Sequence, residues 1–300
     1  MTQQRAHREQ TQRQLTVTLH DGTAMPRLGM GTWYLGEGRR PLADEVDALR
    51  AGLDAGCTLI DTAEMYGDGR AERLVGEALS TLPAGVSRDG LYVVSKVLPE
   101  HAGREHMQAS CEASLDRLGV DCLDLYLYHW RGSIPLEETV ACLEDLRSQG
   151  LIGAWGVSNF DVDDMEELWR IPGGRNCQVN QVLYHAASRG IEFSLLPWMR
   201  EHGVALMSYC PLAQAGALRR GLLEEPVLAN IAAKHDATVP QVLLAWNIRD
   251  GHTIAIPRTG SATHARENAA ALSLVLDAED LAALDDAFPP PEWKMPLDME

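Results

Sequence analysis

Four side chains that could move a proton follow short apolar segments in the first half of the chain. Asp61 and Lys96 each close such a segment, His129 closes a third, and Tyr66 lies five residues after Asp61. If they meet, a buried Lys96 ammonium would lower the Tyr66 pKa by favouring the phenolate, and Asp61 would keep the lysine charged. Tyr66 could then donate a proton near neutral pH to the alkoxide that develops as a carbonyl is reduced. The hydride must come from a cofactor, usually a nicotinamide.

Each of these residues also has an ordinary structural explanation when it is considered alone. Lys96 could be a surface lysine with a buried stem, His129 a core histidine, Tyr66 a loop aromatic and Asp61 a turn residue. Polar side chains also follow the other apolar segments of the second half: Ser158, Asn159, Gln181, Tyr209 and Arg258. The C-terminal ends of the strands of a barrel meet at one rim. We therefore predict that all these side chains converge there.

Short apolar runs alternate with amphipathic helical segments along most of the chain. The runs, taken as strands, are 28–31, 57–60, 91–95, 122–128, 151–157, 177–182, 204–208 and 253–256. Gly56, Gly150 and Gly203 stand where helix C-caps require a positive φ. Eight βα units fit either a closed barrel or an open doubly wound sheet. The segment 29–34 lacks the third glycine of a dinucleotide-binding GxGxxG turn, which favours a (β/α)8 TIM barrel.

The two ends of the chain carry further elements. Alternation on either side of Asp21-Gly22 predicts an N-terminal β-hairpin, and an extra helix is expected at the C-terminus. Residues 1–14 have the composition of a polar tail, and no linker or low-complexity block divides residues 15–300. We therefore expect a disordered tail followed by a single domain.

Composition excludes several classes of function. The formal net charge of −17 would repel nucleic acid. The six cysteines form no CxxC pair, which indicates reduced thiols and a cytoplasmic protein. No run of 18 apolar residues and no secretory signal is present. We therefore expect a protein that neither binds a membrane nor holds a metal ion, and that is a monomer or a weak homo-oligomer. Its expected partner is a small carbonyl compound.

Motifs spread over the chain resemble those of the aldo-keto reductases. They are LGMGTW (28–33), LIDTAEMYGDGRAERLVGEAL (59–79), VVSKV (93–97), DLYLYHW (124–130), GAWGVSNF (153–160), NQVLYH (180–185), SYCPLA (208–213) and AIPRTGSATHARENAAAL (255–272). The resemblance extends from about Leu15 to the last helix, and several separate loops agree in order and spacing. It implies an NAD(P)H-dependent oxidoreductase that reduces aldehydes and ketones.

The resemblance assigns a role to each polar residue at the strand ends. Asp61, Tyr66, Lys96 and His129 correspond to the catalytic tetrad of the family, with Tyr66 as the general acid and His129 orienting the substrate carbonyl. Ser158, Asn159 and Gln181 would bind the nicotinamide carboxamide, and Tyr209 would stack on the nicotinamide ring. Other cofactor contacts would come from Gly31, Thr32, Trp33, Asp61, Cys210, Leu212 and Gln214.

The segment after the last strand corresponds to the part of the family that binds the adenosine 2′-phosphate. Arg258 and Thr259 match its first two positions, whereas His264 stands where an arginine is usual, and Glu267 and Asn268 match the adenine contacts. Because His264 is largely neutral at pH 7, we expect NADPH to be preferred less strongly than a full motif implies. NADH remains an alternative.

The substrate would be held by Tyr66 and His129 together with an aromatic wall of Trp33, Tyr34, Trp130 and Tyr184. The C-terminal segment 289–300 is shorter than the loop that covers bulky substrates in some family members, so we expect an open pocket. The segment RGIEFSLLPW (189–198) is similar to that of bacterial members that reduce small carbonyls such as methylglyoxal.

Two functions of other classes compete with reduction. The same barrel could serve as a cofactor-sensing regulatory subunit, although all four tetrad residues are present. A Schiff-base aldolase could use Lys96 as its nucleophile, but Ser158, Asn159 and Gln181 would then have no role.

Overall fold

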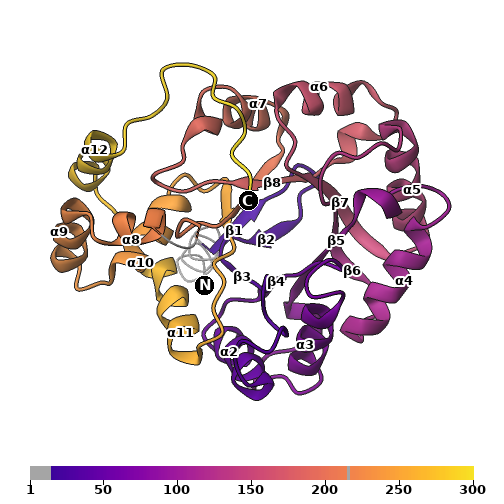
Figure 1. The fold of residues 1–300 in the computed structure, drawn as a ribbon, viewed down its shortest axis with the longest axis horizontal. Coiled ribbons are helices and arrows are strands. Elements are labelled where there is room, and N and C mark those ends of the chain that lie inside the picture. The colour runs from indigo at the N-terminus through magenta and orange to yellow at the C-terminus, as the bar shows by residue number, and fades with distance from the viewer. Residues whose placement is uncertain (1–14, 215–216) are drawn as a thin grey trace, which may run out of the picture.

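Eight parallel strands form a closed barrel in the computed structural model, which describes residues 15–214 and 217–300 (Figure 1). The strands are β3 (Gly29–Gly31), β4 (Leu59–Asp61), β5 (Tyr92–Val97), β6 (Leu123–Tyr128), β7 (Ile152–Ser158), β8 (Val179–Leu183), β9 (Ala205–Tyr209) and β10 (Thr253–Ala255). Parallel bridges from Leu28 to Ala255 and from Gly31 to Arg258 join the first strand to the last. The barrel prediction is confirmed, and each strand begins and ends within two residues of its predicted bounds.

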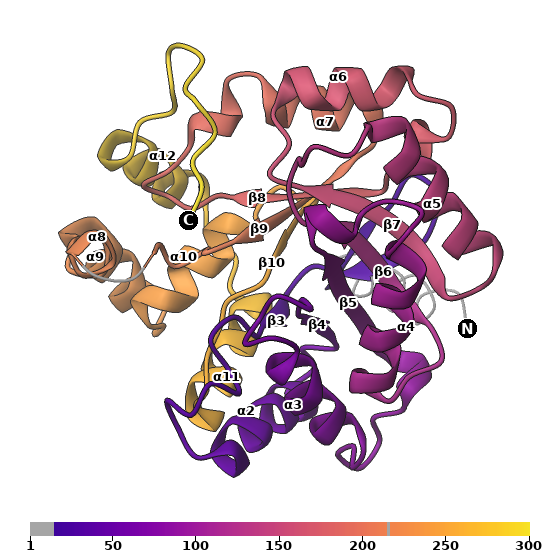
Figure 2. The same ribbon diagram turned by 45° about the vertical axis from the view of Figure 1, so that its right-hand side comes forward.

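Helices surround the barrel, as Figures 1 and 2 show. They are α2 (Leu42–Asp54), α3 (Arg70–Leu79), α4 (Met107–Leu118), α5 (Leu136–Ser148), α6 (Val162–Arg170), α7 (Leu195–His202), α8 (Ala217–Leu223), α9 (Pro226–Lys234), α10 (Val239–Asn247), α11 (Ala262–Ala270) and α12 (Ala278–Ala287). The predicted C-terminal extra helix is α12. Gly56, Gly150 and Gly203 follow helices with φ of 95°, 76° and 71°, as helix C-caps require.

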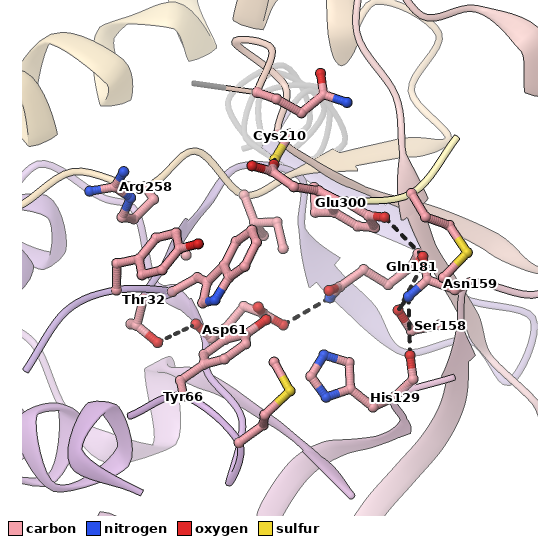
Figure 3. A pocket seen from close by; sticks show the side chains of 18 of the residues that line it. Thr32, Asp61, Tyr66, His129, Ser158, Asn159, Gln181, Cys210, Arg258 and Glu300 are labelled. Carbon is pink, nitrogen blue, oxygen red and sulfur yellow. Dashed lines mark hydrogen bonds between the residues drawn. The ribbon is translucent and has the colours of Figure 1, made fainter. Parts of the chain in front are cut away.

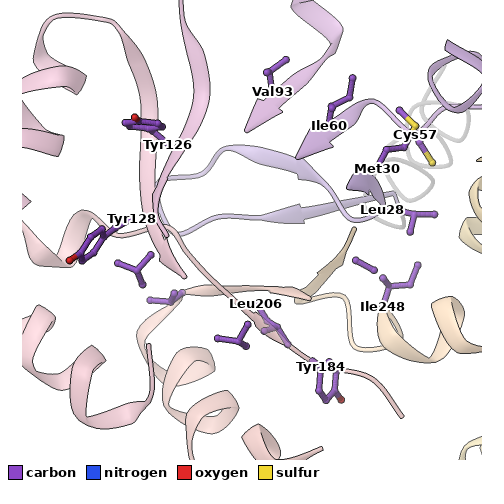
Figure 4. Packing of buried hydrophobic residues seen from close by; sticks show 14 of the residues in the cluster. Leu28, Met30, Cys57, Ile60, Val93, Tyr126, Tyr128, Tyr184, Leu206 and Ile248 are labelled. Atoms are coloured by element: carbon purple, nitrogen blue, oxygen red, sulfur yellow. The ribbon is translucent and has the colours of Figure 1, made fainter. Parts of the chain in front are cut away.

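Two apolar layers hold the barrel together. Outward-facing strand residues such as Ile60, Val93 and Leu206 pack against the helices (Figure 4). Inward-facing residues such as Leu125, Leu127 and Ile254 fill the barrel interior. Because strand side chains alternate between faces, the strands contribute to both layers, except β3, where the positions on either side of Met30 are glycines. The barrel is therefore a packed core rather than a pore.

The predicted N-terminal hairpin is present and covers one end of the barrel. Strands β1 (Thr16–Thr18) and β2 (Ala24–Pro26) pair antiparallel around a turn in which Gly22 has a φ of 90°. Val17 and Met25 are buried among the interior barrel residues. With this end covered, the opposite end, where the strands terminate, is left for a functional site.

Several other expectations concern the whole chain. All six cysteines are free thiols, as predicted. In the part of the chain that the structure describes, no helix has both the length and the apolarity to cross a bilayer. The expected polar tail, residues 1–14, lies outside the described residues.

Candidate active site

A cavity of about 360 Å³ opens at the C-terminal end of the strands (Figure 3). Of the predicted catalytic residues, Asp61, Tyr66 and His129 line it. Nine further residues predicted to bind the cofactor also line the cavity: Gly31, Thr32, Ser158, Asn159, Gln181, Tyr209, Cys210, Gln214 and Arg258. The predicted substrate residues Trp33, Tyr34 and Trp130 complete the wall. The polar strand ends therefore converge, as the sequence predicts.

Lys96 lies behind the cavity wall, fully buried at the end of β5. Its Nζ donates to Asp61 Oδ1 at 2.6 Å, to the Thr62 carbonyl oxygen at 2.9 Å and to Tyr66 Oη at 3.1 Å. An ammonium group has three protons, and all three are used here. As an ammonium group, Lys96 therefore has a partner for each proton, one of them the Tyr66 phenol, and has no lone pair with which to attack a substrate.

The protonation of this cluster differs from the expectation in one respect. Burial raises the Tyr66 pKa well above its ordinary value, and the charge of Asp61 raises it further, so the prediction of a lowered pKa is wrong. Burial also raises the Asp61 pKa and lowers the Lys96 pKa, while their ion pair opposes both shifts. The lysine charge is matched by Asp61, so it does not offset the loss of water around a Tyr66 phenolate. Tyr66 therefore stays protonated at neutral pH.

His129 faces Tyr66 across the cavity, with ring centroids 5.8 Å apart. Burial lowers its pKa well below the ordinary value, and the positive charge of Lys96 lowers it further. Its Nδ1 is buried without a hydrogen-bond partner among the described residues. A neutral imidazole in this position can donate one hydrogen bond and accept another without carrying charge.

A chain of hydrogen bonds joins the polar residues of β7, β8 and β9. Asn159 Nδ2 donates to the His129 carbonyl oxygen at 3.1 Å, and Tyr209 Oη donates to Asn159 Oδ1 at 2.9 Å. Ser158 Oγ donates to the Gln181 carbonyl oxygen at 2.8 Å, and Gln181 Nε2 donates to Asp61 Oδ2 at 2.8 Å. Gln181 was predicted to follow its strand, but it lies inside β8, because the strand continues to Leu183. This network connects the tetrad to the opposite wall.

Strained backbone gathers at the same rim. Tyr34, Asn159, Cys210 and Ala213 have φ between 50° and 67° and all line the cavity. The left-handed region is unfavourable for residues with a Cβ and is enriched at functional sites. The sequence offers no signal for these conformations, so they are independent support for placing the site here.

The aromatic wall forms only in part. Trp33 stacks on Tyr34 at 4.5 Å between centroids, and Trp130 lies 4.7 Å from the His129 ring. Tyr184 is not part of it, because its ring is buried against Trp246 and its hydroxyl donates to Glu192 at 2.6 Å. The expectation for Tyr184 is therefore wrong.

Some predicted cofactor residues lie outside the cavity lining. Leu212 is buried beside it, and Thr259 lies in the loop after β10. His264, Glu267 and Asn268 belong to α11, and of these only Asn268 is buried. His264 and Glu267 are exposed, and α11 begins shortly after Arg258 in the chain.

Six residues that the sequence did not indicate also line the cavity: Met65, Ala213, Arg219, Ile256, Met299 and Glu300. Met299 and Glu300 place the end of the C-terminal segment in the cavity wall, which the expectation of an open pocket did not include. Residues 288–300 run from α12 back to the barrel mouth (Figures 1 and 2), where Cys210 Sγ donates to Glu300 Oε2 at 3.0 Å. A contact made by the last two residues of an irregular segment has no sequence signature.

Comparison with known proteins adds to this geometry. The model of the aldo/keto reductase family matches residues 27–288. Methylglyoxal reductase YeaE of Escherichia coli is 51% identical over 286 residues, which are 95% of this chain and 99% of that protein. Glyoxal reductase of Bacillus subtilis is 36% identical and covers 90% of this chain and 91% of its own length.

A solved structure has a very similar fold. An aldo/keto reductase from Klebsiella pneumoniae in complex with NADP and acetate superposes with a TM-score of 0.91 at 52% identity, and the match covers 95% of this chain and 99% of that one. Family model, sequence relatives and solved structures agree with the motifs and with the barrel. The chain belongs to the aldo/keto reductase family.

Proposed function

We propose that this protein reduces small aldehydes and ketones to alcohols with NADPH, and that Tyr66 is the proton donor. The observation that carries the proposal is the Tyr66 phenol, which lines the cavity and accepts a hydrogen bond from Lys96 at 3.1 Å. Asp61 Oδ1 accepts a second hydrogen bond from the same lysine, at 2.6 Å from Lys96 Nζ. Family membership and the similarity to methylglyoxal reductase YeaE support the same reaction class.

The cavity residues fit a nicotinamide dinucleotide. Hydroxyl, amide and aromatic groups of Ser158, Asn159 and Tyr209 suit the nicotinamide end, whereas Arg219 and Arg258 supply positive charge for phosphates. We assign Gly31, Thr32, Gln181, Cys210, Leu212, Gln214, Thr259, His264, Glu267 and Asn268 to the same cofactor. The nicotinamide would supply the hydride that reduces the carbonyl carbon.

The protein's own residues would manage the proton and the orientation of the substrate. Tyr66 gives its phenolic proton to the carbonyl oxygen, and the ammonium of Lys96 stabilises the phenolate that remains. His129, which is neutral, hydrogen-bonds the carbonyl oxygen and thereby orients it. Because burial keeps Tyr66 protonated at neutral pH, the proton is available without a preceding protonation step.

The substrate class follows from the wall of the cavity. Trp33, Trp130 and Met65 present apolar surface next to Tyr66. Met299 and Glu300 also line the cavity, and their presence favours compact carbonyls such as methylglyoxal over bulky ones. We also propose that residues 15–300 form one cytoplasmic domain that acts as a monomer or weak homo-oligomer.

Steady-state kinetics with methylglyoxal and NADPH tests the proposal. We expect NADPH to be oxidised only when the aldehyde is present. The loss of absorbance at the nicotinamide band measures this oxidation. If the cofactor binds but no aldehyde or ketone from a broad panel is turned over, the regulatory-subunit alternative replaces reduction. The aldolase alternative is not favoured, because Lys96 is fully buried and all its protons are donated.

A further inference from the structure

Residues 35–41, the arginine loop, connect β3 to α2 and carry Arg39 and Arg40 to the segment that follows β10. A Cβ built on Gly260 would lie only 3.1 Å from Arg40 Cδ, so the Arg40 side chain lies against this segment. Arg39 Cζ lies 3.9 Å from the centroid of the Tyr34 ring, and Arg258 Cζ lies 5.9 Å from the same centroid. Loops from opposite ends of the barrel sequence therefore bring arginines together beside the cavity.

These arginines have little compensating negative charge. Among the residues that the structure describes, no carboxylate oxygen lies within 4.0 Å of a guanidinium nitrogen of Arg40, Arg219 or Arg258. Arg39 has one such neighbour, Glu37, at 3.9 Å. Burial lowers the Arg258 pKa, and the positive charges of Arg219 and Arg39 lower it further. Like charges that face each other without partners form a site for an anion.

The arginine loop is held in place by the fold. Gly36 has a φ of 75°, and a Cβ there would lie 2.9 Å from the Arg70 carbonyl oxygen, so this position requires glycine. The Gly36 N–H donates to the buried Glu45 carboxylate at 2.8 Å, and the Leu35 N–H donates to the Thr32 carbonyl at 2.9 Å. The loop therefore presents its arginines from a fixed backbone.

We propose that Arg40, assisted by Arg39, binds the 2′-phosphate of NADPH and is the residue that selects NADPH over NADH. This inference rests on the proposed function, in which Arg258 and the start of α11 hold the adenosine end of the cofactor. α2 and α11 pack side by side (Figure 1), and Arg40, in the loop just before α2, contacts Gly260 just before α11. Arg40 would add a permanent positive charge beside the start of α11, which itself carries the exposed His264 and Arg266.

The carboxylate of Glu45 is a buried negative group near this site, in addition to Glu37 beside Arg39. It is 1% exposed, packs 3.4 Å from the Gly260 Cβ position through its Cγ, and directs an oxygen at the Gly36 N–H. Its role is to anchor the loop. A dianionic phosphate would be attracted to the guanidinium groups of Arg40 and Arg258, whereas the Glu45 carboxylate is buried and accepts the Gly36 N–H.

Binding measurements on the full-length protein test the inference. Quenching of tryptophan fluorescence, with Trp33 in the cavity wall, reports Kd for NADPH and for NADH separately. In Arg40→Gln we expect Kd for NADPH to rise about tenfold or more, the loss expected for one charge-assisted bond, while Kd for NADH changes less than twofold. Arg40→Lys should keep most of the preference. Arg170→Gln, on the surface of α6, should alter neither constant.

A second probe isolates the phosphate from the nicotinamide. Adenosine 2′,5′-bisphosphate should lose affinity in Arg40→Gln, whereas 5′-AMP should not. If Arg40→Gln has the same NADPH-to-NADH affinity ratio as the wild type, the inference is wrong. The proposed function still holds in that case, provided that the wild type binds NADPH and turns over the aldehyde. If the wild type binds neither dinucleotide, the proposed function fails and this inference fails with it.

Discussion

Lys96 Nζ donates a hydrogen bond of 3.1 Å to Tyr66 Oη from a position that solvent does not reach. The same nitrogen is held by Asp61 and by the Thr62 carbonyl, so its direction is fixed. A hydrogen bond from a cation stabilises the phenolate more than the phenol. Its main effect therefore comes after Tyr66 has released its proton, since burial keeps the phenol protonated before that.

Replacing the phenol hydroxyl of Tyr66 tests this role directly. We expect Tyr66→Phe to lower kcat for aldehyde reduction by roughly 10²- to 10⁴-fold, the usual contribution of a positioned acid, with little change in Kd for NADPH. Single-turnover absorbance measurements and fluorescence quenching give the two quantities.

Tyr92→Phe is the matched control for that change. Tyr92 begins β5 at the hairpin end of the barrel, so the same hydroxyl is removed far from the cavity. It should retain near-normal kcat. If Tyr66→Phe also retains it, Tyr66 is not the acid.

The buried ion pair predicts a specific pattern of stability. Lys96→Met leaves the Asp61 carboxylate, 2% exposed, without its counter-charge, and we expect a loss of about 3–5 kcal/mol in the free energy of unfolding. Adding Asp61→Asn removes that charge, so the double variant should recover at least about 2 kcal/mol while remaining inactive. Urea denaturation measures both. A double variant no more stable than Lys96→Met would show that lost packing, and not the unpaired charge, causes the effect.

The pKa shifts of Tyr66 and His129 predict a flat pH profile for reduction. Burial raises the Tyr66 pKa, so the proton-donating form persists as pH rises through neutrality. Burial and Lys96 lower the His129 pKa, so the imidazole stays neutral as pH falls toward 6. We expect kcat for reduction to change little between pH 6 and 9. A tenfold fall per pH unit within this range would mean that the phenol titrates there, contrary to its burial.

The barrel could be predicted because its signals are periodic and local. Segments 91–95 and 122–128 are apolar on both faces and are followed by helices with a single apolar stripe, which is what a strand buried on both faces requires. Closure could not be predicted from periodicity, since it depends on the bridges Leu28–Ala255 and Gly31–Arg258, between residues far apart in sequence.

Part of the candidate site could be predicted from the sequence and part could not. Asp61, Lys96 and His129 could be found because each ends an apolar strand, and strand ends converge in a barrel. The direction of the Tyr66 pKa shift could not be predicted from the sequence. It depends on whether burial, which raises the pKa, outweighs the charge of Lys96, which is already matched by Asp61. Glu300 could not either, because an irregular segment carries no periodicity to show where its end lies.

The charge of Glu300 is expected to weaken cofactor binding. Its side-chain carboxylate accepts a hydrogen bond from Cys210, which is assigned to the cofactor, and Figure 3 shows the two side chains next to each other in the cavity. A negative charge there repels a dinucleotide. We expect Glu300→Gln to lower Kd for NADPH by roughly two- to fivefold, corresponding to about 0.5–1 kcal/mol for a charge that solvent partly screens, and we expect the gain to shrink at high salt. Glu292→Gln, in the same segment but outside the cavity lining, should leave Kd unchanged. A higher Kd in Glu300→Gln would show instead that the C-terminal residue holds the bound cofactor in place.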